Sequence, residues 1–586
     1  MLPKEKTRAQ RYLRKLAALT CGDSDAATRL IKGGLYLWQC QKFPFLVKRR
    51  PRSISDYLGN PLVIEFSEWL AELDTLTAAF WLSSAYSHCV GKELLKERAM
   101  FFTPPELSTR VIDNLISNGA SLTRHTWADP ATGGGAFLAP VAMRMAEALR
   151  SEGKSAKSVL QHIAKHLVGN DIDPCLAGLS GEFLRMVLAD EIRTSGFEPE
   201  FRVTTKNALT RSRHLSGAIN VVICNPPYRK MPATEVDLYR NSYQETIGGQ
   251  PNLYALFFKL TLDLLAPDGI AGLLTPTSFL SGHYFMPLRR YVRANSDICQ
   301  IDTLSHSSAF VGVEQETAIT VFRRRTGAQS LREVRVFALT KNAGFRDIGV
   351  CRIPESGAVW AIPRGDEDAK TLQAINGSEH RLADYGYVAR VGAFVWNRDT
   401  RKTFMKPPAR KTKTLFPLIW SSDIGQDGSF QLGRQRPPGR HGSYVDLGTT
   451  NHSSIIRKPS VALQRVTSSD QPRRLIGAAI PEELRRNFGG VVGENHVVFL
   501  EQVSDTPALT PAQLSQLLKS ETIDRLFRCI SGAVNVSVFE LAHLPLPDPA
   551  KLKRAMASTD SIDDAVRKAF GLSSRCVTGP VGIQKS

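Results

Sequence analysis

The chain has no long apolar run. Its 586 residues contain no uncharged apolar stretch of about 18 residues, the length that a membrane-spanning helix needs. The most apolar stretch, residues 253–280, is interrupted by Lys259, Asp263 and Asp268. The N-terminal sequence MLPKEKTRAQRYLRK also lacks the apolar centre of a secretory signal peptide. We therefore expect a cytoplasmic protein with no membrane partner.

Closely spaced cysteines are missing as well. The nine cysteines are scattered, and the nearest two, Cys21 and Cys40, lie nineteen residues apart. Structural zinc sites take ligand pairs only about two to four residues apart, and disulfide frameworks need an even number of cysteines. His125, His162 and His166 supply no third ligand near them. We expect no metal site and a reducing compartment.

Acidic residues are fewer than basic residues, and the excess of basic residues is confined to two segments of the chain. Lys and Arg number 75 against 56 Asp and Glu, a net charge of +19. Residues 1–60 carry +9 and residues 401–480 carry +10, so the rest of the chain sums to zero. Two separate basic blocks favour two surfaces that contact a polyanion such as nucleic acid. Solvated basic loops are the alternative interpretation.

The length suggests about three domains, at roughly 100–200 residues each. Residues 1–90 combine the first basic block with helical periodicity and are expected to form a basic helical N-terminal extension. In residues 91–330 apolar strand-like runs alternate with helical patterns. Residues 331–586 are irregular and rich in Pro, Gly and Arg, and are expected to form a separate domain.

The middle region predicts an α/β fold. Alternation of strands with helices favours a parallel, doubly wound sheet. The expected strands lie within residues 125–130, 166–173, 201–205, 219–225, 270–276, 298–304 and 317–322. The expected helices cover residues 105–118, 137–150, 175–195, 252–266 and 286–295.

Two motifs follow the first two expected strands. The sequence Asp129-Pro-Ala-Thr-Gly-Gly-Gly135 leads into a helix, and glycines there let a ligand approach the backbone and the helix N-terminus. A purely structural strand-to-helix turn would also explain it. The second motif, residues 169–174, ends in Asp171-Ile-Asp173. Either carboxylate could accept hydrogen bonds from a ribose diol, or could cap the next helix.

The third motif is the most specific. The apolar run of residues 221–224 leads directly into Asn225-Pro226-Pro227-Tyr228. Two prolines stiffen the backbone, so the Asn225 amide and the Pro226 carbonyl are held in place. These two oxygens can accept hydrogen bonds from one amino group, and the Tyr228 ring offers a flat stacking surface beside them.

The order of the motifs resembles that of a known family. The element Phe101-Phe-Thr-Pro-Pro-Glu106 precedes the glycine motif, as it does in the gamma-class, TaqI-type N6-adenine DNA methyltransferases of restriction-modification systems. The resemblance covers residues 95–330 closely and the C-terminal third distantly, and does not include residues 1–90. It implies a Rossmann-like, doubly wound core that uses S-adenosylmethionine, followed by an α+β target recognition domain.

The resemblance also assigns residues to the cofactor. Thr103 and Pro104 would contact its methionine end, and Asp171 would bind the ribose hydroxyls, with Asp173 as the fallback. Asn207 stands where the family usually has an Asp that contacts the cofactor's adenine. An amide both donates and accepts, so binding can survive this departure. The pocket would be lined by Asp129, Ala131, Gly133 and Gly135.

The catalytic roles come from the same resemblance. The oxygens of Asn225 and Pro226 would accept hydrogen bonds from the target amine and favour a tetrahedral nitrogen, whose lone pair can attack a methyl group. Tyr228 and Phe310 would stack on the adenine, which must leave the duplex to be reached. No metal takes part.

These inferences predict a site-specific adenine DNA methyltransferase of a bacterial or archaeal restriction-modification or phage-defence system. Its partner is double-stranded DNA, and a restriction endonuclease can act with it as a separate chain. Three alternatives stay open: an amino-group methyltransferase for RNA or a protein glutamine, a non-catalytic DNA-binding specificity subunit, and a fused restriction enzyme.

The second basic block gives a first prediction. Neutralising Arg434, Arg436 and Arg440 together should weaken DNA binding and reduce its dependence on salt, because fewer counterions are released from the DNA. Cofactor binding should not change. Titrations of DNA over a range of salt concentrations test this, and an unchanged salt slope would make the block a solvated loop.

Overall fold

The computed structural model divides into two compact units. The first comprises residues 1–279, 284–347 and 355–357, and the second comprises residues 280–283, 348–354 and 358–586. The structure describes residues 3–47, 52–211, 215–304, 316–327, 333–340, 344–354, 356–375, 380–409, 412–434, 442–467, 471–531 and 535–573. Each unit has its own hydrophobic core.

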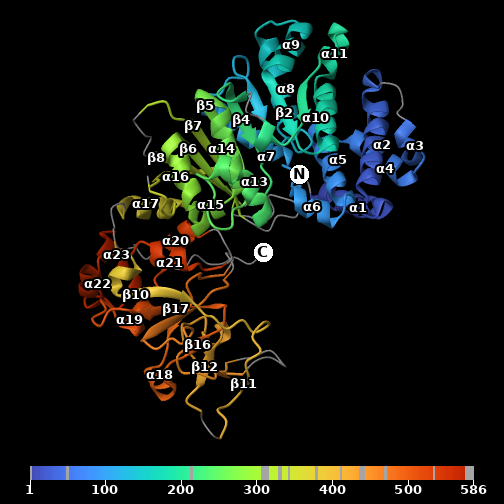
Figure 1. Ribbon diagram of the computed structural model, residues 1–586. Coiled ribbons are helices and arrows are strands. Elements are labelled where there is room, and N and C mark those ends of the chain that lie inside the picture. Colours follow the sequence, from blue (N-terminus) through green and yellow to red (C-terminus); the bar gives the residue numbers. More distant parts are fainter. Residues whose placement is uncertain are drawn as a thin grey trace. The chain divides into compact units, whose positions relative to one another are not determined.

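The first unit contains most of a nine-stranded sheet, with strand order β3-β2-β1-β4-β5-β7-β6-β8-β9 (Figure 1). The strands are β1 (Trp127–Asp129), β2 (Leu167–Asp171), β3 (Arg202–Thr205), β4 (Ile219–Cys224), β5 (Leu265–Pro276), β6 (Ser296–Leu304), β7 (Thr317–Arg324), β8 (Glu333–Leu339) and β9 (Phe345–Arg352). All seven strands expected from the sequence are present, so the predicted α/β core is confirmed.

The sheet departs from the expected parallel arrangement at one strand. Strands β1 to β5 pair in parallel, but β7 lies between β5 and β6 and runs antiparallel to both. Residues 317–322 form an almost continuous apolar run, which predicts a buried strand. Such a run by itself contains no information about strand direction.

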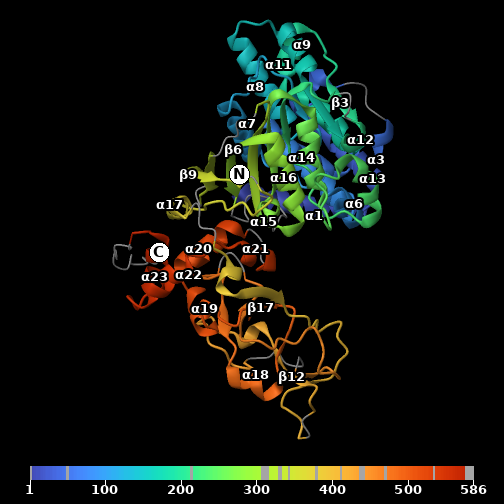
Figure 2. The ribbon, with the colours of Figure 1, turned by 60° about the vertical axis from the view of Figure 1, so that its left-hand side comes forward.

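Helices pack on the sheet. The helices of this part are α7 (Pro105–Ser117), α8 (Leu138–Ser151), α9 (Ala156–His166), α10 (Pro174–Val187), α11 (Ala189–Ser195), α12 (Ala208–Arg211), α13 (Ala233–Tyr243), α14 (Leu253–Leu264), α15 (Ser278–Ser281) and α16 (Met286–Asn295). Helices α8 and α10 contact each other, and so do α14 and α16, which lie side by side in both views (Figure 1, Figure 2). The helices α9, α12, α13 and α15 were not predicted from the sequence.

The strand order reverses next to β1. From β1 the chain moves outward to β2 and β3, and it then returns to the other side of β1 with β4 and β5. Ligands of open α/β sheets bind in the crevice that such a reversal leaves at the carboxyl ends of the strands. The motifs that follow β1, β2 and β4 therefore meet at one edge of the sheet.

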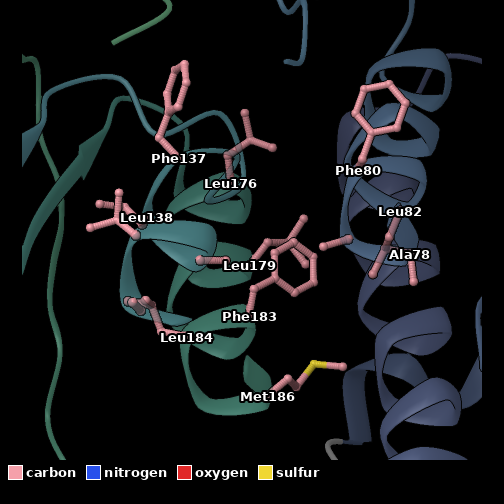
Figure 3. Packing of buried hydrophobic residues seen from close by; sticks show 14 of the residues in the cluster. Ala78, Phe80, Leu82, Phe137, Leu138, Leu176, Leu179, Phe183, Leu184 and Met186 are labelled. Carbon is pink, nitrogen blue, oxygen red and sulfur yellow. The ribbon is translucent and has the colours of Figure 1, made fainter. Parts of the chain in front are cut away.

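The N-terminal helices belong to the same core. They are α1 (Pro3–Thr20), α2 (Ser24–Lys42), α3 (Ser55–Leu58), α4 (Pro61–Glu72), α5 (Thr75–Cys89) and α6 (Lys92–Arg98). Helices α5 and α10 pack together, and Phe80 and Leu82 of α5 belong to the same buried cluster as Leu179 and Phe183 of α10 (Figure 3). The ring of Trp38 from α2 lies 6.1 Å from that of Phe183. A continuous set of buried apolar residues thus joins these helices to the α/β core.

The second unit contains two four-stranded sheets, of order β10-β17-β14-β15 and β11-β13-β12-β16. The strands are β10 (Tyr387–Val391), β11 (Thr403–Phe404), β12 (Leu415–Ile419), β13 (Tyr444–Asp446), β14 (Ser460–Gln464), β15 (Gly477–Ala479), β16 (Val492–Gly493) and β17 (Val497–Gln502). The helices are α17 (Asp366–Ala374), α18 (Glu482–Phe488), α19 (Pro511–Leu517), α20 (Glu521–Ile530), α21 (Val538–His543), α22 (Pro549–Met556) and α23 (Ile562–Phe570).

Across the described ranges, no helix combines the length and the apolar character that crossing a membrane would require.

The contact between α5 and α10 gives a stability prediction. Phe183 is fully buried, so Phe183→Ala should lower the free energy of unfolding by about 3–5 kcal/mol through lost burial and the cavity left behind. Phe45 is a matched control, because its ring is 46% exposed; Phe45→Ala should cost less than about 1 kcal/mol. Urea unfolding of both variants measures the difference, and equal losses would contradict the shared core.

Candidate active site

A pocket opens at the carboxyl ends of β1, β2 and β4. It encloses about 780 Å³ of empty space, including the open solvent at its mouth. Five residues that the sequence predicted for the site line it: Ala131, Gly133, Asp171, Asn207 and Asn225. The remaining lining comes mainly from residues 98–102, 170–176, 206–209 and 227–239, with Leu253 and Phe257.

The glycine motif forms a tight turn after β1. Gly133, Gly134 and Gly135 have φ angles of 52°, 74° and 77°, a left-handed conformation that other residues rarely adopt. A Cβ on Gly134 would lie 2.4 Å from Oγ of Ser83 in α5, and one on Gly135 would lie 3.2 Å from Cα of Ser180 in α10. Glycine is therefore required here for close packing as well as for backbone conformation.

Asp171, at the end of β2, braces this turn. Its Oδ2 accepts hydrogen bonds from the backbone N–H of Gly133 at 2.9 Å and from the Thr132 hydroxyl at 3.4 Å. Its Oδ1 accepts from the N–H of Asp173 at 2.9 Å. Burial raises the pKa of Asp171 to about 6, against the lowering effect of these hydrogen bonds. The carboxylate borders the pocket and keeps lone pairs for a ligand hydroxyl.

Asp173, the fallback for the ribose, is the N-cap of α10. Its carboxylate accepts from the N–H groups of Cys175 and Leu176, at 2.8 and 3.2 Å. It also accepts from the Tyr86 hydroxyl of α5 and forms an ion pair with Arg98 at 3.2 Å. The helix-cap interpretation therefore holds for Asp173, and of the two carboxylates Asp171 has more capacity left for a ligand.

Asp129 is the last residue of β1. It is buried, and its Oδ1 accepts from the N–H of Ala131 at 3.0 Å. Burial raises its pKa to about 8, and the nearby Asp171 carboxylate adds to the rise. Asp129 thus shapes the turn, while Ala131 and Gly133 form the wall that a ligand can touch.

The Asn225 side chain is oriented by hydrogen bonds. Its Nδ2 donates to the carbonyl of Phe101 at 3.1 Å and to Oγ1 of Thr103 at 3.0 Å. Because both amide hydrogens are used there, Oδ1 must face the opposite way. The Tyr228 hydroxyl lies 2.5 Å from this Oδ1 and 2.8 Å from the carbonyl of Leu274. The Phe-Thr-Pro element thus positions the amide oxygen of the Asn-Pro-Pro-Tyr motif.

The Tyr228 ring lies among other aromatic rings. Its centroid is 6.5 Å from that of Phe101, with 19° between the planes, and 6.2 Å from that of Tyr254 at 85°. Burial holds the pKa of Tyr228 well above the ordinary value. Tyr228 is half-buried, and its hydroxyl points inward.

Helix α13 supplies a wall of the pocket that the sequence analysis missed. Arg229 forms a two-pronged ion pair with Glu235, at 2.5 and 2.6 Å, which joins the chain after Tyr228 to α13. One turn further on, the Tyr239 hydroxyl accepts a hydrogen bond from Nδ2 of Asn207 at 2.9 Å.

Some predicted residues contribute differently or lie elsewhere. Thr103 acts through Asn225, and Pro104 precedes the first turn of α7. Arg434 is half-buried and donates to Oγ of Ser429 at 2.7 Å. Phe310, Arg436 and Arg440 lie outside the described residues. Within the part of the chain that the structure describes, no three His, Cys, Asp or Glu side chains are placed to hold a metal ion.

The pocket fits a nucleoside-bearing cofactor such as S-adenosylmethionine. The glycine turn leaves backbone open on one side, since a Cβ on Gly133 would meet no atom nearer than 3.5 Å. Asp171 offers an acceptor for a ribose hydroxyl, and the adjacent Ile172, 53% exposed, offers an apolar surface for a base. Asn207 lies across the same pocket.

Known proteins resemble this chain in the same region. Residues 166–310 match the family described as Eco57I restriction-modification methylase. The chain is 21% identical over 377 residues to the type II methyltransferase M.PstI of Providencia stuartii, covering 60% of this chain and 71% of that protein. It is 24% identical over 250 residues to the type II methyltransferase M.XhoI of Xanthomonas vasicola, covering 41% of this chain and 45% of that protein.

Two solved structures share the fold. One is the type IIL restriction-modification enzyme MmeI in complex with DNA, with TM-score 0.52 and 12% identity over 95% of this chain and 89% of that one. The other is the DrdV–DNA complex, with TM-score 0.50 and 12% identity over 88% of this chain and 63% of that one. The family match and the type II relatives support a restriction-modification methylase. The sequence predicted a protein of this class.

Asp129 gives a prediction about pH. Because the pKa of Asp129 is raised to about 8, its side chain stays protonated in the folded protein up to that pH. In an unfolded chain an Asp has a pKa of about 3.9. The free energy of unfolding of the wild type, relative to that of Asp129→Asn, should therefore fall by at most about 1.4 kcal/mol per pH unit as the pH rises toward 8. Above that pH the difference should level off.

Urea unfolding of the two proteins at several pH values tests this. Taking the difference cancels the contribution of the histidines and other groups that both proteins share. Parallel stability curves would show that Asp129 is not protonated in the folded state.

Proposed function

We propose that this protein transfers a methyl group from S-adenosylmethionine to the exocyclic amine of adenine in double-stranded DNA, as a gamma-class enzyme of a restriction-modification or phage-defence system. The observation that carries the proposal is the Asn225 amide. Both of its hydrogens are held by Phe101 and Thr103, which leaves an oriented oxygen acceptor beside a pocket that fits a nucleoside.

An oriented acceptor suits this chemistry. The amine of adenine is conjugated with its ring and is a poor nucleophile. When Oδ1 of Asn225 and the carbonyl oxygen of Pro226 accept hydrogen bonds from its two N–H groups, the nitrogen becomes more tetrahedral and its lone pair is directed away from the ring. The rate then depends on positioning and on acceptors that are in place before the reaction.

The cofactor supplies an electrophilic methyl group on a sulfonium centre when bound. The backbone of Ala131 and Gly133 and the carboxylate of Asp171 are the groups that would hold its nucleoside part, with Asn207 beside its base. The buried Asp171 carboxylate suits a cationic ligand, because the ligand offsets part of the desolvation that raises the pKa of this residue.

The target base must leave the duplex, which costs a few kcal/mol. Stacking on the Tyr228 ring offsets this cost by roughly 1–3 kcal/mol. To receive the amine, Oδ1 of Asn225 uses a second lone pair or gives up the Tyr228 hydroxyl, which already has an alternative acceptor in the carbonyl of Leu274. Phe310 is proposed as the second stacking residue.

The two basic blocks are proposed as phosphate contacts. Within the N-terminal block, Arg8 and Arg11 pair with Glu72 and Glu65, so the contribution to DNA falls mainly on cations such as Arg14 and Lys15, which are exposed. The block at residues 401–480 lies in the second unit, the proposed target recognition domain. A nuclease on a separate chain would complete the system in a cytoplasm that also holds the DNA.

Methylation mapping tests the proposal. The wild-type protein, expressed in a host without DNA methylation, should place N6-methyladenine in one sequence motif. Asn225→Ala should reduce methyl transfer by at least about a hundredfold, because it removes a preorganised acceptor, while DNA binding is retained. Single-base mapping of modified bases and a filter assay for DNA binding measure the two properties.

Asn241→Ala is the matched control, because Asn241 is exposed on α13 and should leave methylation unchanged. Methylated protein or RNA beside unmodified DNA would replace the proposal with one of the other acceptors. Failure of the wild type to bind S-adenosylmethionine would indicate the non-catalytic alternative. Full activity of Asn225→Ala would refute the mechanism.

A further inference from the structure

Asn207 and Tyr239 form a pair at the end of the pocket where the base of the cofactor would lie. Asn207 follows β3, and Tyr239 lies on α13. Both side chains line the pocket, and Tyr239 is largely buried, with 8% of its surface exposed. The inference that follows rests on the proposed function and concerns what this pair recognises.

The orientation of the Asn207 amide is set by the backbone. The N–H of Leu209 donates to Oδ1 of Asn207 at 3.1 Å. A backbone N–H can only donate, so the atom that it meets must be the amide oxygen. Nδ2 consequently faces the Tyr239 hydroxyl, 2.9 Å away. The amide cannot be flipped without breaking both contacts.

This orientation determines the role of the Tyr239 hydroxyl. An amide nitrogen only donates, so the phenol oxygen acts as acceptor toward Asn207 and its own hydrogen is left for another group. None of the described residues takes that hydrogen in a hydrogen bond, whereas the neighbouring Tyr243 donates its own to the carbonyl of Leu209 at 2.8 Å. The Tyr239 hydroxyl therefore offers the pocket a hydrogen-bond donor that none of the described residues uses.

A carboxylate at position 207 would change this. An Asp accepts only, so it would take the hydrogen of the Tyr239 hydroxyl and leave the pocket with acceptors alone. With Asn207 the pair offers one acceptor, the second lone pair of Oδ1, and one donor, the Tyr239 O–H. The edge of a 6-aminopurine has the complementary pattern of an amine donor beside ring-nitrogen acceptors.

We propose that Tyr239 is a specificity-determining residue for the cofactor, whose hydroxyl donates a hydrogen bond to a ring nitrogen of the cofactor's adenine while Oδ1 of Asn207 accepts from its exocyclic amine. The Asn at position 207 and the Tyr on α13 act as one recognition unit. A 6-oxopurine, which has an acceptor in place of the amine, would be rejected by Oδ1.

Binding of cofactor products tests this without turnover. S-adenosylhomocysteine and its 1-deaza and 7-deaza analogues, in which one ring nitrogen is replaced by CH, are titrated calorimetrically into the full-length protein. One of the two analogues should bind the wild type roughly three- to tenfold more weakly than the parent compound, the range for one neutral hydrogen bond. In Tyr239→Phe the same analogue should bind as well as the parent compound.

Two further variants separate recognition from folding. Tyr243→Phe is the matched control: it removes a hydroxyl from the same helix, one that is used inside the protein, and should keep the analogue penalty of the wild type. Asn207→Asp should abolish the penalty even though Tyr239 is present, because the carboxylate introduced by this substitution takes the hydroxyl hydrogen. A structural role for Tyr239 would not produce this loss.

The outcomes distinguish the inference from the proposed function. If the wild type does not bind S-adenosylhomocysteine, the proposed function fails. If it binds all three compounds equally, or if Tyr239→Phe keeps the wild-type penalty, the cofactor site stands and the role of Tyr239 is refuted.

Discussion

The reversal of strand order between β1 and β4 is the constraint on which the site depends. A sheet that grows outward from β1 in both directions leaves a crevice at the carboxyl ends of its two central strands. The glycine turn, Asp171 and Asn225 follow β1, β2 and β4, and so converge although they are about a hundred residues apart in the chain. The antiparallel β7 extends this sheet beyond β5 without disturbing the reversal.

Polar groups around the pocket are already held by partners. The Asn225 amide is held by Phe101 and Thr103, Asp171 by the turn that it braces, and Asp173 by α10, Tyr86 and Arg98. Such a site loses little entropy when a ligand arrives, because its side chains have been ordered during folding. Folding bears the cost instead, most clearly in the buried carboxylates of Asp129 and Asp171.

Short sequence patterns, such as apolar runs and turn motifs, made much of the fold and part of the site predictable. A run such as Val221–Cys224 that enters Asn-Pro-Pro-Tyr contains both a buried strand and a stiff turn, so β4 and Asn225 could be placed from the sequence. The partners of Asn225 and the wall formed by α13 could not, because Tyr239 reaches Asn207 only through tertiary packing. The choice between Asp171 and Asp173 likewise depended on which carboxylate caps α10, and two acidic residues after a strand look alike in sequence.

The continuous core between α5 and α10 has a consequence for evolution. Recombination tends to preserve function where few contacts cross the junction. A junction near residue 90 would separate Phe80 and Leu82 of α5 from Leu179 and Phe183 of α10 (Figure 3). It would also leave Asp173 without the hydrogen bond from the Tyr86 hydroxyl. The N-terminal helices and the α/β core should therefore be inherited together. The second unit has a hydrophobic core of its own and can diverge in sequence at a different rate.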